Sequence, residues 1–237
     1  MNPDEALQVS IEDEVAVLRL DDGKANAMSH DVIDQFHTGL DRALADARAV
    51  AIIGRPGRFS AGFDLRVMQA GDKPMQDLVL AGADLFLRVY AHPQPVVAAC
   101  TGHALAGGAL LLLSADTRVG VMGDFKIGLN EVAIGMPLPA FAVELARDRL
   151  SPNELTAATV QSRIYDPAGA VQSGYLDRLA ESDDPTEEAV AEARGLGELR
   201  SGAVAATKTR LRTATIRRIR ASLPDDITEL TLNAANG

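Results

Sequence analysis

The chain contains two stretches in which an apolar strand runs into a glycine-rich turn and then a helix, and these most constrain its fold. They are AIIGRPGRFSAGFDL at residues 51–65 and VVAACTGHALAGGALLLL at residues 96–113. In open α/β sheets, ligands bind beyond the carboxyl ends of the strands, where helix N-termini present unpaired N–H groups. Two adjacent turns of this kind could direct two N–H groups at one developing oxyanion. They could equally be tight turns that allow close helix packing.

The remainder of the chain alternates strands and helices up to about residue 138 and is mostly helical beyond it. We expect strands at residues 7–12, 15–22, 49–54, 95–102 and 117–122, and helices at 29–47, 75–92, 107–115, 140–150, 151–162, 166–174, 184–200 and in a final basic segment. Residues 55–63 are expected to form a loop, and Ser29 and Ser151 are expected N-caps. The alternation predicts an α/β fold with a largely parallel sheet and crossover helices.

Composition limits the class of protein. The formal net charge of −10 argues against general nucleic-acid binding, which requires a basic surface. No apolar run approaches the ~20 residues that span a bilayer, and the N-terminus lacks the features of a secretory signal. The single cysteine, Cys100, fits a reducing compartment. We therefore expect a cytoplasmic protein with no nucleic-acid or membrane partner.

Basic residues gather near the C-terminus in spite of the negative net charge. They are Lys208, Arg210, Arg212, Arg217, Arg218 and Arg220. Two interpretations remain open, namely a solvated helix face and a contact with an anion, either a phosphate or a neighbouring subunit.

A single carboxylate stands among apolar residues in DFKIGLNEVAIG, residues 124–135. Glu131 has Leu129, Val132 and Ile134 around it. A carboxylate buried without partners is costly and responds by raising its pKa. Glu131 could therefore be a general base, although a surface turn or a helix cap would also explain the pattern.

Four segments carry a resemblance to a known family. DDGKANAMS, GRFSAGFDL, PVVAACTGHALAGGALLLLSADTRV and FKIGLNEVAIGMPLP occur in this order, and the resemblance covers about residues 14–180. The chain resembles the crotonase (enoyl-CoA hydratase/isomerase) superfamily. This implies a ClpP/crotonase-type fold, with two roughly perpendicular β-sheets wrapped by helices and a helical C-terminal part. We expect a core domain at residues 1–195 and a helical trimerisation segment at 196–237, in a homotrimer or a dimer of trimers.

The resemblance also implies the site. In this family the oxyanion hole consists of two backbone N–H groups. By the resemblance, these groups belong here to Phe63 and Gly107, and the base is Glu131. The hydratases have a second glutamate three residues after the oxyanion glycine, where this chain has Leu110. Residues expected to contact the acyl-coenzyme A substrate are Lys24, Ala25, Ala27, Ala61, Gly62, Asp64, Leu65, His103 and Leu110.

The absent glutamate favours one branch of the family, the Δ3,Δ2-enoyl-CoA isomerases, which resemble this chain in the segment IGLNE. One carboxylate suffices there, because isomerisation only moves a proton from C2 to C4 of the acyl chain. A hydratase or another crotonase reaction with one glutamate remains an alternative, as does a non-catalytic acyl-CoA-binding protein. The thioester is the substrate, so the resemblance implies no cofactor, and no His/Cys/Asp/Glu cluster has the spacing of a metal site.

Two of the expected contact residues have other interpretations as well. Asp64 is expected to cap the helix that follows the first turn. His103 stands at the mouth of the second turn, where it could touch the ligand or could simply be packed or solvated.

Lys24 and one or more of the residues from Lys208 to Arg220 are expected to bind the phosphates of coenzyme A.

Overall fold

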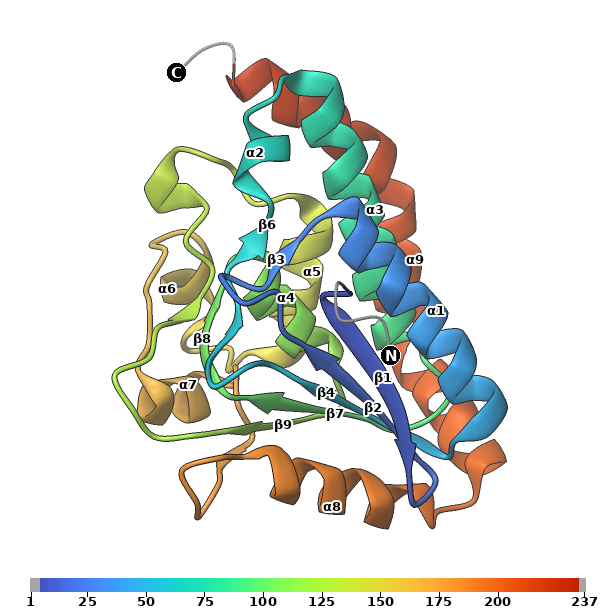
Figure 1. Cartoon of the computed structure of the whole chain (residues 1–237). Coiled ribbons are helices and arrows are strands. Elements are labelled where there is room, and N and C mark those ends of the chain that lie inside the picture. Colours follow the sequence, from blue (N-terminus) through green and yellow to red (C-terminus); the bar gives the residue numbers. More distant parts are fainter. Residues whose placement is uncertain (1–4, 235–237) are drawn as a thin grey trace.

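The computed structural model describes residues 5–234, and from residue 227 onward it describes the backbone alone. A six-stranded sheet forms the base of the molecule, with the strand order β1-β2-β4-β7-β9-β11 (Figure 1). Its first pair is antiparallel and its other pairs are parallel. The strands are β1 (Leu7–Glu12), β2 (Val15–Leu20), β4 (Ala49–Ile53), β7 (Val96–Cys100), β9 (Thr117–Gly120) and β11 (Arg178–Leu179).

Two smaller sheets lie above this base. One is parallel with the order β10-β8-β5, and the other pairs β3 with β6. The strands are β3 (Ala27–Met28), β5 (Gly57–Ser60), β6 (Gly62–Phe63), β8 (Gly102–Leu105) and β10 (Ile127–Gly128). The expectation of a loop at residues 55–63 is therefore wrong, because β5 and β6 form there. Strands this short have no periodicity to detect, and their pairing partners come from elsewhere in the chain.

Helices cover both faces of the large sheet. They are α1 (His30–Asp46), α2 (Leu65–Met68), α3 (Asp72–Tyr90), α4 (Gly107–Ser114), α5 (Ala140–Arg149), α6 (Leu155–Thr159), α7 (Pro167–Ser173), α8 (Thr186–Gly197) and α9 (Ser201–Ala234), with a 3₁₀ helix η1 (Val132–Ile134). In Figure 1, α8 runs beneath the sheet, while α1 and α3 lie above it. The helical last third is confirmed. No helix in the described part of the chain is both long and apolar enough to cross a membrane.

Alternation along the strands explains why the sheet is covered on both sides. Val15 and Val17 of β2 pack toward α8, whereas Ala16 and Leu18 face the main core. Successive side chains of a strand point to opposite faces, and parallel strands buried on both faces are apolar throughout. All five residues of β4 are accordingly inaccessible to solvent. The predicted parallel α/β architecture follows from these runs.

The sequence predicts three helix caps, and the structure confirms two of them. Ser29 caps α1, because its Oγ accepts a hydrogen bond from Val32 N at 3.3 Å. Asp64 caps α2 through Arg66 N at 2.9 Å, so this prediction is also confirmed. The Ser151 cap is wrong, because residues 152–154 form a turn and α6 begins only at Leu155.

The final helix, α9, is held to the core by ion pairs that are largely shielded from solvent. Lys208 Nζ lies 2.6 Å from Asp116 Oδ2, and Arg212 Nη2 lies 2.8 Å from Asp116 Oδ1. Lys208 also donates to the Gln94 carbonyl at 2.9 Å. Burial lowers the pKa of Lys208 to about 8, although Asp116 opposes the shift. These two cations are internal, so neither the solvated-face interpretation nor a coenzyme A contact applies to them.

Other basic residues of α9 remain at the surface. Arg218 pairs with Glu144 of α5 at 2.5 Å, while Arg210, Arg217 and Arg220 are exposed. The division of the chain at residues 195 and 196 falls inside α8 and stays a prediction.

Asp116→Asn should destabilise the fold by about 3 kcal/mol, because it leaves Lys208 and Arg212 buried without their counter-charge. Urea unfolding at neutral pH measures this change. Asp13→Asn is the matched control, since Asp13 pairs with Arg194 at an exposed site and should cost less than about 1 kcal/mol. Equal losses in the two variants would contradict the anchoring role of Asp116.

Candidate active site

Three turns meet at one edge of the small parallel sheet. β5, β8 and β10 are neighbouring parallel strands, so their carboxyl ends lie on the same side. The chain beyond β5 leads to Phe63, beyond β8 to Gly107, and beyond β10 to Glu131. The sheet thereby brings the three predicted catalytic residues to one place, at the edge where α/β sheets bind ligands.

The two glycine-rich turns touch each other. A Cβ atom added to Gly62 would lie 3.1 Å from Gly107 N, and Gly62 has a φ of +94°, which side chains rarely adopt. A Cβ on Gly108 would lie 2.2 Å from the Ser60 carbonyl oxygen. Gly107 is the first residue of α4, so its N–H has no acceptor within the helix. This close approach requires glycine and leaves a backbone donor at the edge of the site.

Asn26 ties the segment before α1 to the first turn. Its Nδ2 donates to the Leu20 carbonyl at 2.9 Å and to the Phe59 carbonyl at 3.1 Å, and its φ is +53°. Ala61 N then donates to Ala25 O at 3.0 Å. Sequence reasoning missed Asn26, although asparagine tolerates positive φ better than most residues. It holds the strip containing Ala25 and Ala27 against the site.

Ala106 carries backbone strain at the start of α4. Its φ of +50° and ψ of −124° are unusual for a residue with a side chain, and strain of this kind concentrates at functional sites. Its N–H donates to the Gly128 carbonyl at 3.0 Å, which links the second turn to β10. No sequence signal marks this residue.

Glu131 is held by its own backbone at the start of η1. Its carbonyl accepts hydrogen bonds from Ile134 N at 3.1 Å and Met136 N at 2.9 Å. Its side-chain Oε2 is buried and has no hydrogen-bond partner among the described residues. Burial raises the pKa of Glu131 to about 7, in spite of the nearby backbone N–H groups of Asn130 and Glu131. The carboxyl group is therefore able to accept and return a proton near neutral pH.

Glu131 and Leu110 line the same apolar cavity, which has a volume of about 460 Å³. Its wall consists of Ala25, Ala27, Ala61, Phe63, Asp64, Leu65, Met68, Val79, Leu105, Ala106, Leu110, Asn130, Glu131, Ile134, Met136, Pro137, Pro139 and Phe141. Leu110 is buried at the position where the resemblance implies a second glutamate in the hydratases. Asn130 was missed by sequence reasoning, and its Oδ1 is buried without a partner in the described structure.

The second carboxylate on the wall, Asp64, differs from Glu131 in its environment. Arg66 donates to Asp64 through Nη2 at 2.8 Å, and this bond holds the pKa of Asp64 below its ordinary value. Because it is ionised and already paired, Asp64 is a poor general base. Glu131 is the wall carboxylate whose pKa suits proton transfer.

Three predicted contact residues lie outside the cavity wall. His103 accepts a hydrogen bond from Lys126 N at 3.0 Å and packs edge-on against Phe125. Lys24 is exposed beside the Ala25 strip. Gly62 is buried behind the wall. These positions leave Ala25, Ala27, Ala61, Asp64, Leu65 and Leu110 as the predicted contact residues that reach the cavity.

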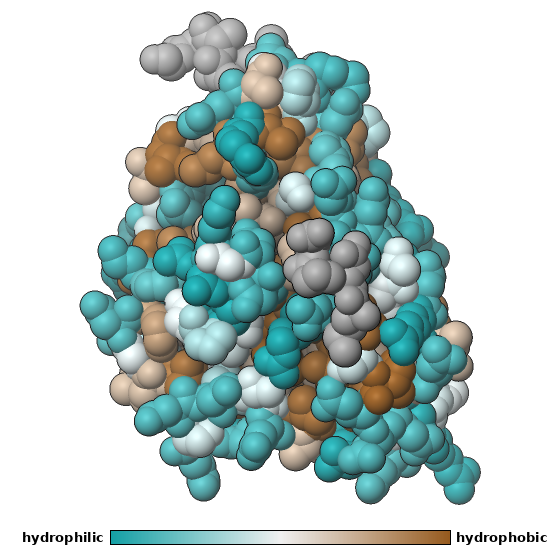
Figure 2. All heavy atoms as spheres, in the orientation of Figure 1, coloured by the Kyte–Doolittle hydropathy of each residue, from teal (hydrophilic) through white to brown (hydrophobic). Residues whose placement is uncertain are grey.

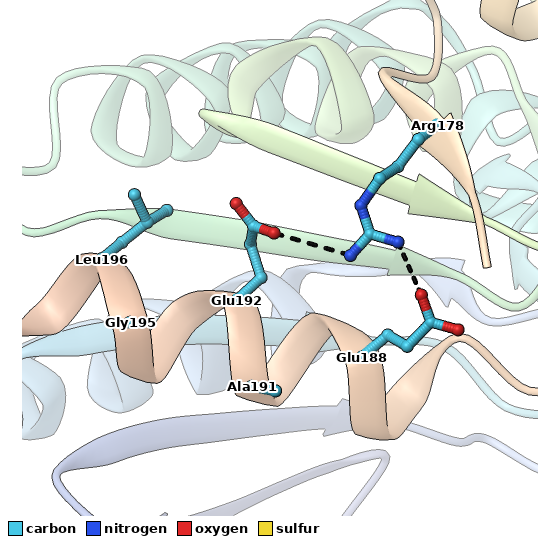
Figure 3. Close-up of a pocket in the computed structure, with 6 residues that line it drawn as sticks. All are labelled: Arg178, Glu188, Ala191, Glu192, Gly195 and Leu196. Atoms are coloured by element: carbon cyan, nitrogen blue, oxygen red, sulfur yellow. Dashed lines mark hydrogen bonds and ion pairs between the residues drawn. The ribbon is translucent and has the colours of Figure 1, made fainter. Parts of the chain in front are cut away.

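The other hollows are less suited to a small-molecule ligand. In the hollow beside α8, Arg178 bridges Glu188 at 2.6 Å and Glu192 at 3.5 Å, so the guanidinium is already paired with two carboxylates of the protein (Figure 3). Among the described residues, no cluster of His, Cys, Asp or Glu could hold a metal ion. By contrast, the exposed apolar side chains of Leu65 and Ile134 line the cavity that contains Glu131. Figure 2 shows apolar surface over this part of the molecule.

Comparison with known proteins agrees with this fold. The family model of enoyl-CoA hydratase/isomerase matches residues 10–231. A putative enoyl-CoA hydratase of Thermus thermophilus is 34% identical over 191 residues, which cover 78% of this chain and 73% of that protein. The mitochondrial enoyl-CoA delta isomerase 1 of Mus musculus is 31% identical over 177 residues, covering 71% of this chain and 60% of that protein.

A solved structure extends the similarity to nearly the whole chain. An enoyl-CoA hydratase/isomerase family protein from Pseudomonas syringae has a TM-score of 0.92 and 40% identity, with 95% of this chain and 98% of that chain covered. The fold is that of the crotonase class of proteins. Within this class, the chain belongs to the enoyl-CoA hydratase/isomerase family. Its relatives are named both hydratase and isomerase, and it spans less than two thirds of the mouse isomerase.

Glu131→Gln should make the folded state more stable at about pH 8, by on the order of 2 kcal/mol. The folded state retains the Glu131 proton up to about pH 7, whereas an ordinary glutamate carboxyl in the unfolded chain releases it near pH 4.5. Between about pH 4.5 and about pH 7, the folded state thus binds more protons than the unfolded state. The stability of the folded state therefore falls as pH rises through this range. Urea unfolding of both proteins at about pH 8 and about pH 5 measures the effect. A stability difference that does not change with pH would contradict the raised pKa.

Proposed function

We propose that this protein is a Δ3,Δ2-enoyl-CoA isomerase, which converts 3-enoyl-CoA to 2-enoyl-CoA. The observation that carries the proposal is that Glu131, whose pKa is raised, and Leu110 line the same apolar cavity. A single carboxylate can move a proton between two carbons, whereas hydration needs a water molecule held between an acid and a base. The similarity to a mouse isomerase supports the same choice.

The proposed reaction begins with proton removal from C2 of the acyl chain by the Glu131 carboxylate. The electron pair of the C2–H bond moves toward the thioester carbonyl, whose oxygen becomes an enolate. Glu131 then returns the proton to C4, and the double bond moves from C3–C4 to C2–C3. No atom is gained or lost, so the reaction requires no co-reactant.

The backbone N–H groups of Phe63 and Gly107 are the proposed donors to the enolate oxygen. The contact between their two turns supports this role, since Gly62 and Gly107 nearly touch. Donors that are part of the backbone are already oriented before the reaction, so they need no rearrangement as charge develops. The apolar wall excludes water, which strengthens these bonds.

The apolar wall also serves the base. A carboxylate of ordinary pKa would be ionised but only weakly basic, whereas Glu131 titrates near the operating pH. Leu110 occupies the position at which a hydratase has its second glutamate. The cavity therefore offers no second carboxylate there to hold a water molecule near C3 of the substrate. The cavity thus favours proton transfer over hydration.

The coenzyme A moiety is proposed to follow the strip at Ala25 and Ala27, with Lys24 at its exposed edge. Arg210, Arg217 and Arg220 are the α9 cations left for a phosphate or a neighbouring subunit, because Lys208 and Arg212 are used internally. We also propose a homo-oligomer, a trimer or a dimer of trimers, in which the exposed side of α9 participates; Leu211 on that side is 68% exposed.

A hydratase with a single glutamate is the second candidate, and the name of the Thermus relative favours it. A non-catalytic acyl-CoA-binding protein is the candidate from another class. Purified protein incubated with 3-enoyl-CoA and, separately, with 2-enoyl-CoA distinguishes the three. We expect isomerisation to be at least about 100-fold faster than hydration, since one of the two hydratase carboxylates is replaced by Leu110. Equal rates would contradict the isomerase, and no turnover of either substrate would favour the binder.

Glu131→Gln should reduce the isomerase rate by at least about 10³-fold, roughly 4 kcal/mol in barrier. The substitution keeps the size of the side chain and removes its ability to accept a proton. Binding of the coenzyme A ester should persist, because the oxyanion donors are backbone groups. Glu187→Gln, on the exposed side of α8, is the control and should leave the rate unchanged. A Glu131→Gln protein that retains activity within about tenfold of wild type would remove Glu131 from the mechanism.

A further inference from the structure

A glycine in α3 makes room for the side chain of Phe63. A Cβ atom on Gly82 would lie 2.2 Å from Phe63 Cε1 and 2.3 Å from Phe63 Cζ. Carbon atoms that are not bonded settle at about 3.5–4.0 Å, so the ring occupies the volume that any other residue at position 82 would fill. Gly82 is buried in the middle of the helix, where glycine is less favourable than alanine. A packing requirement explains its presence.

The Phe63 ring has few directions in which it could move. Phe86, fully buried and about one turn further along α3, lies beside it with a ring-centroid distance of 6.0 Å, and Phe86 in turn packs on Phe141 at 6.2 Å. Phe63 and Phe141 both line the cavity that contains Glu131. A ring pushed away from α3 therefore enters this cavity, because a packed core does not yield and the cavity is open.

We propose that Gly82 is a specificity-determining residue, which widens the acyl cavity by letting the Phe63 ring recede into α3. The inference rests on the proposed function in one respect, namely that the cavity holds the acyl chain of a thioester. The backbone N–H of Phe63 is held separately by the strip around it, since Ala61 N donates to Ala25 O and Asp64 N to Met28 O. Gly82 thus affects the space available to the acyl chain more than it affects the position of the oxyanion donor.

Gly82→Ala tests this directly, with binding of saturated acyl-CoA esters as the readout. Butyryl-, octanoyl- and dodecanoyl-CoA have no double bond to move, so calorimetric affinities remain informative even if the protein is not an isomerase. We expect Gly82→Ala to weaken octanoyl- and dodecanoyl-CoA binding by about tenfold or more, and butyryl-CoA binding by less than about threefold. A change in the ratio of the three affinities cannot come from a smaller folded fraction of the protein, because that would lower all three affinities alike.

A second substitution should reverse the effect. Phe63→Leu removes the two ring atoms that overlap the new methyl group, whereas Phe63 Cδ1 lies at an ordinary 3.6 Å from it. Adding Gly82→Ala to Phe63→Leu should therefore change every affinity by less than about threefold, because the two positions act through one contact. If Gly82→Ala alone does not fold, the double variant should still fold.

Gly39→Ala is the matched control, since Gly39 is also buried in a helix and a Cβ there would crowd Val9 and Leu18 at 3.1 and 3.2 Å. These neighbours lie away from the cavity, so Gly39→Ala should leave the ratio of the three affinities unchanged. An equal loss for all chain lengths in Gly82→Ala, no loss at all, or the same loss in the Phe63→Leu background would each overturn the proposal. Failure of the double variant to fold would overturn it as well.

Discussion

Backbone pairing of β8 with β5 on one side and β10 on the other brings together three segments that are distant in the sequence. Parallel strands end at the same edge, so Phe63, Gly107 and Glu131 come to one place through hydrogen bonds of the backbone. Glycine at positions 62 and 108 then lets the turns approach within atomic contact. Without this pairing, the two turns and the carboxylate would be unrelated features of three loops.

The cavity that results is apolar, and this single property has two consequences. Desolvation raises the pKa of Glu131 to about 7, and in the proposed reaction the same desolvation would strengthen hydrogen bonds to the enolate. The free energy required to bury the carboxyl group comes from the core around it, in which Leu110, Phe141 and Phe86 are almost inaccessible to solvent. In the proposed mechanism, stability and catalysis are thus opposed at Glu131, as is common where a titratable group is buried for function.

The C-terminal helix shows how local charge can mislead. A row of cations suggests a surface for anions, yet Lys208 and Arg212 neutralise Asp116 inside the molecule. The side chains reach Asp116 because α9 packs against α3 and α5. Which members of a charge cluster face inward depends on this packing and leaves no trace in composition.

The sequence by itself determined the parallel α/β architecture, the Ser29 and Asp64 caps, the two glycine turns and the apolar setting of Glu131. These features depend on periodicity and on local backbone requirements, which neighbouring residues specify. Tertiary structure alone decided that β5 and β6 form, that His103 lies outside the cavity, and that Gly82 makes space for Phe63. It also decided the strain at Ala106 and the role of Asn26. Each of these depends on contacts between distant segments, and such contacts form only when the whole chain is packed.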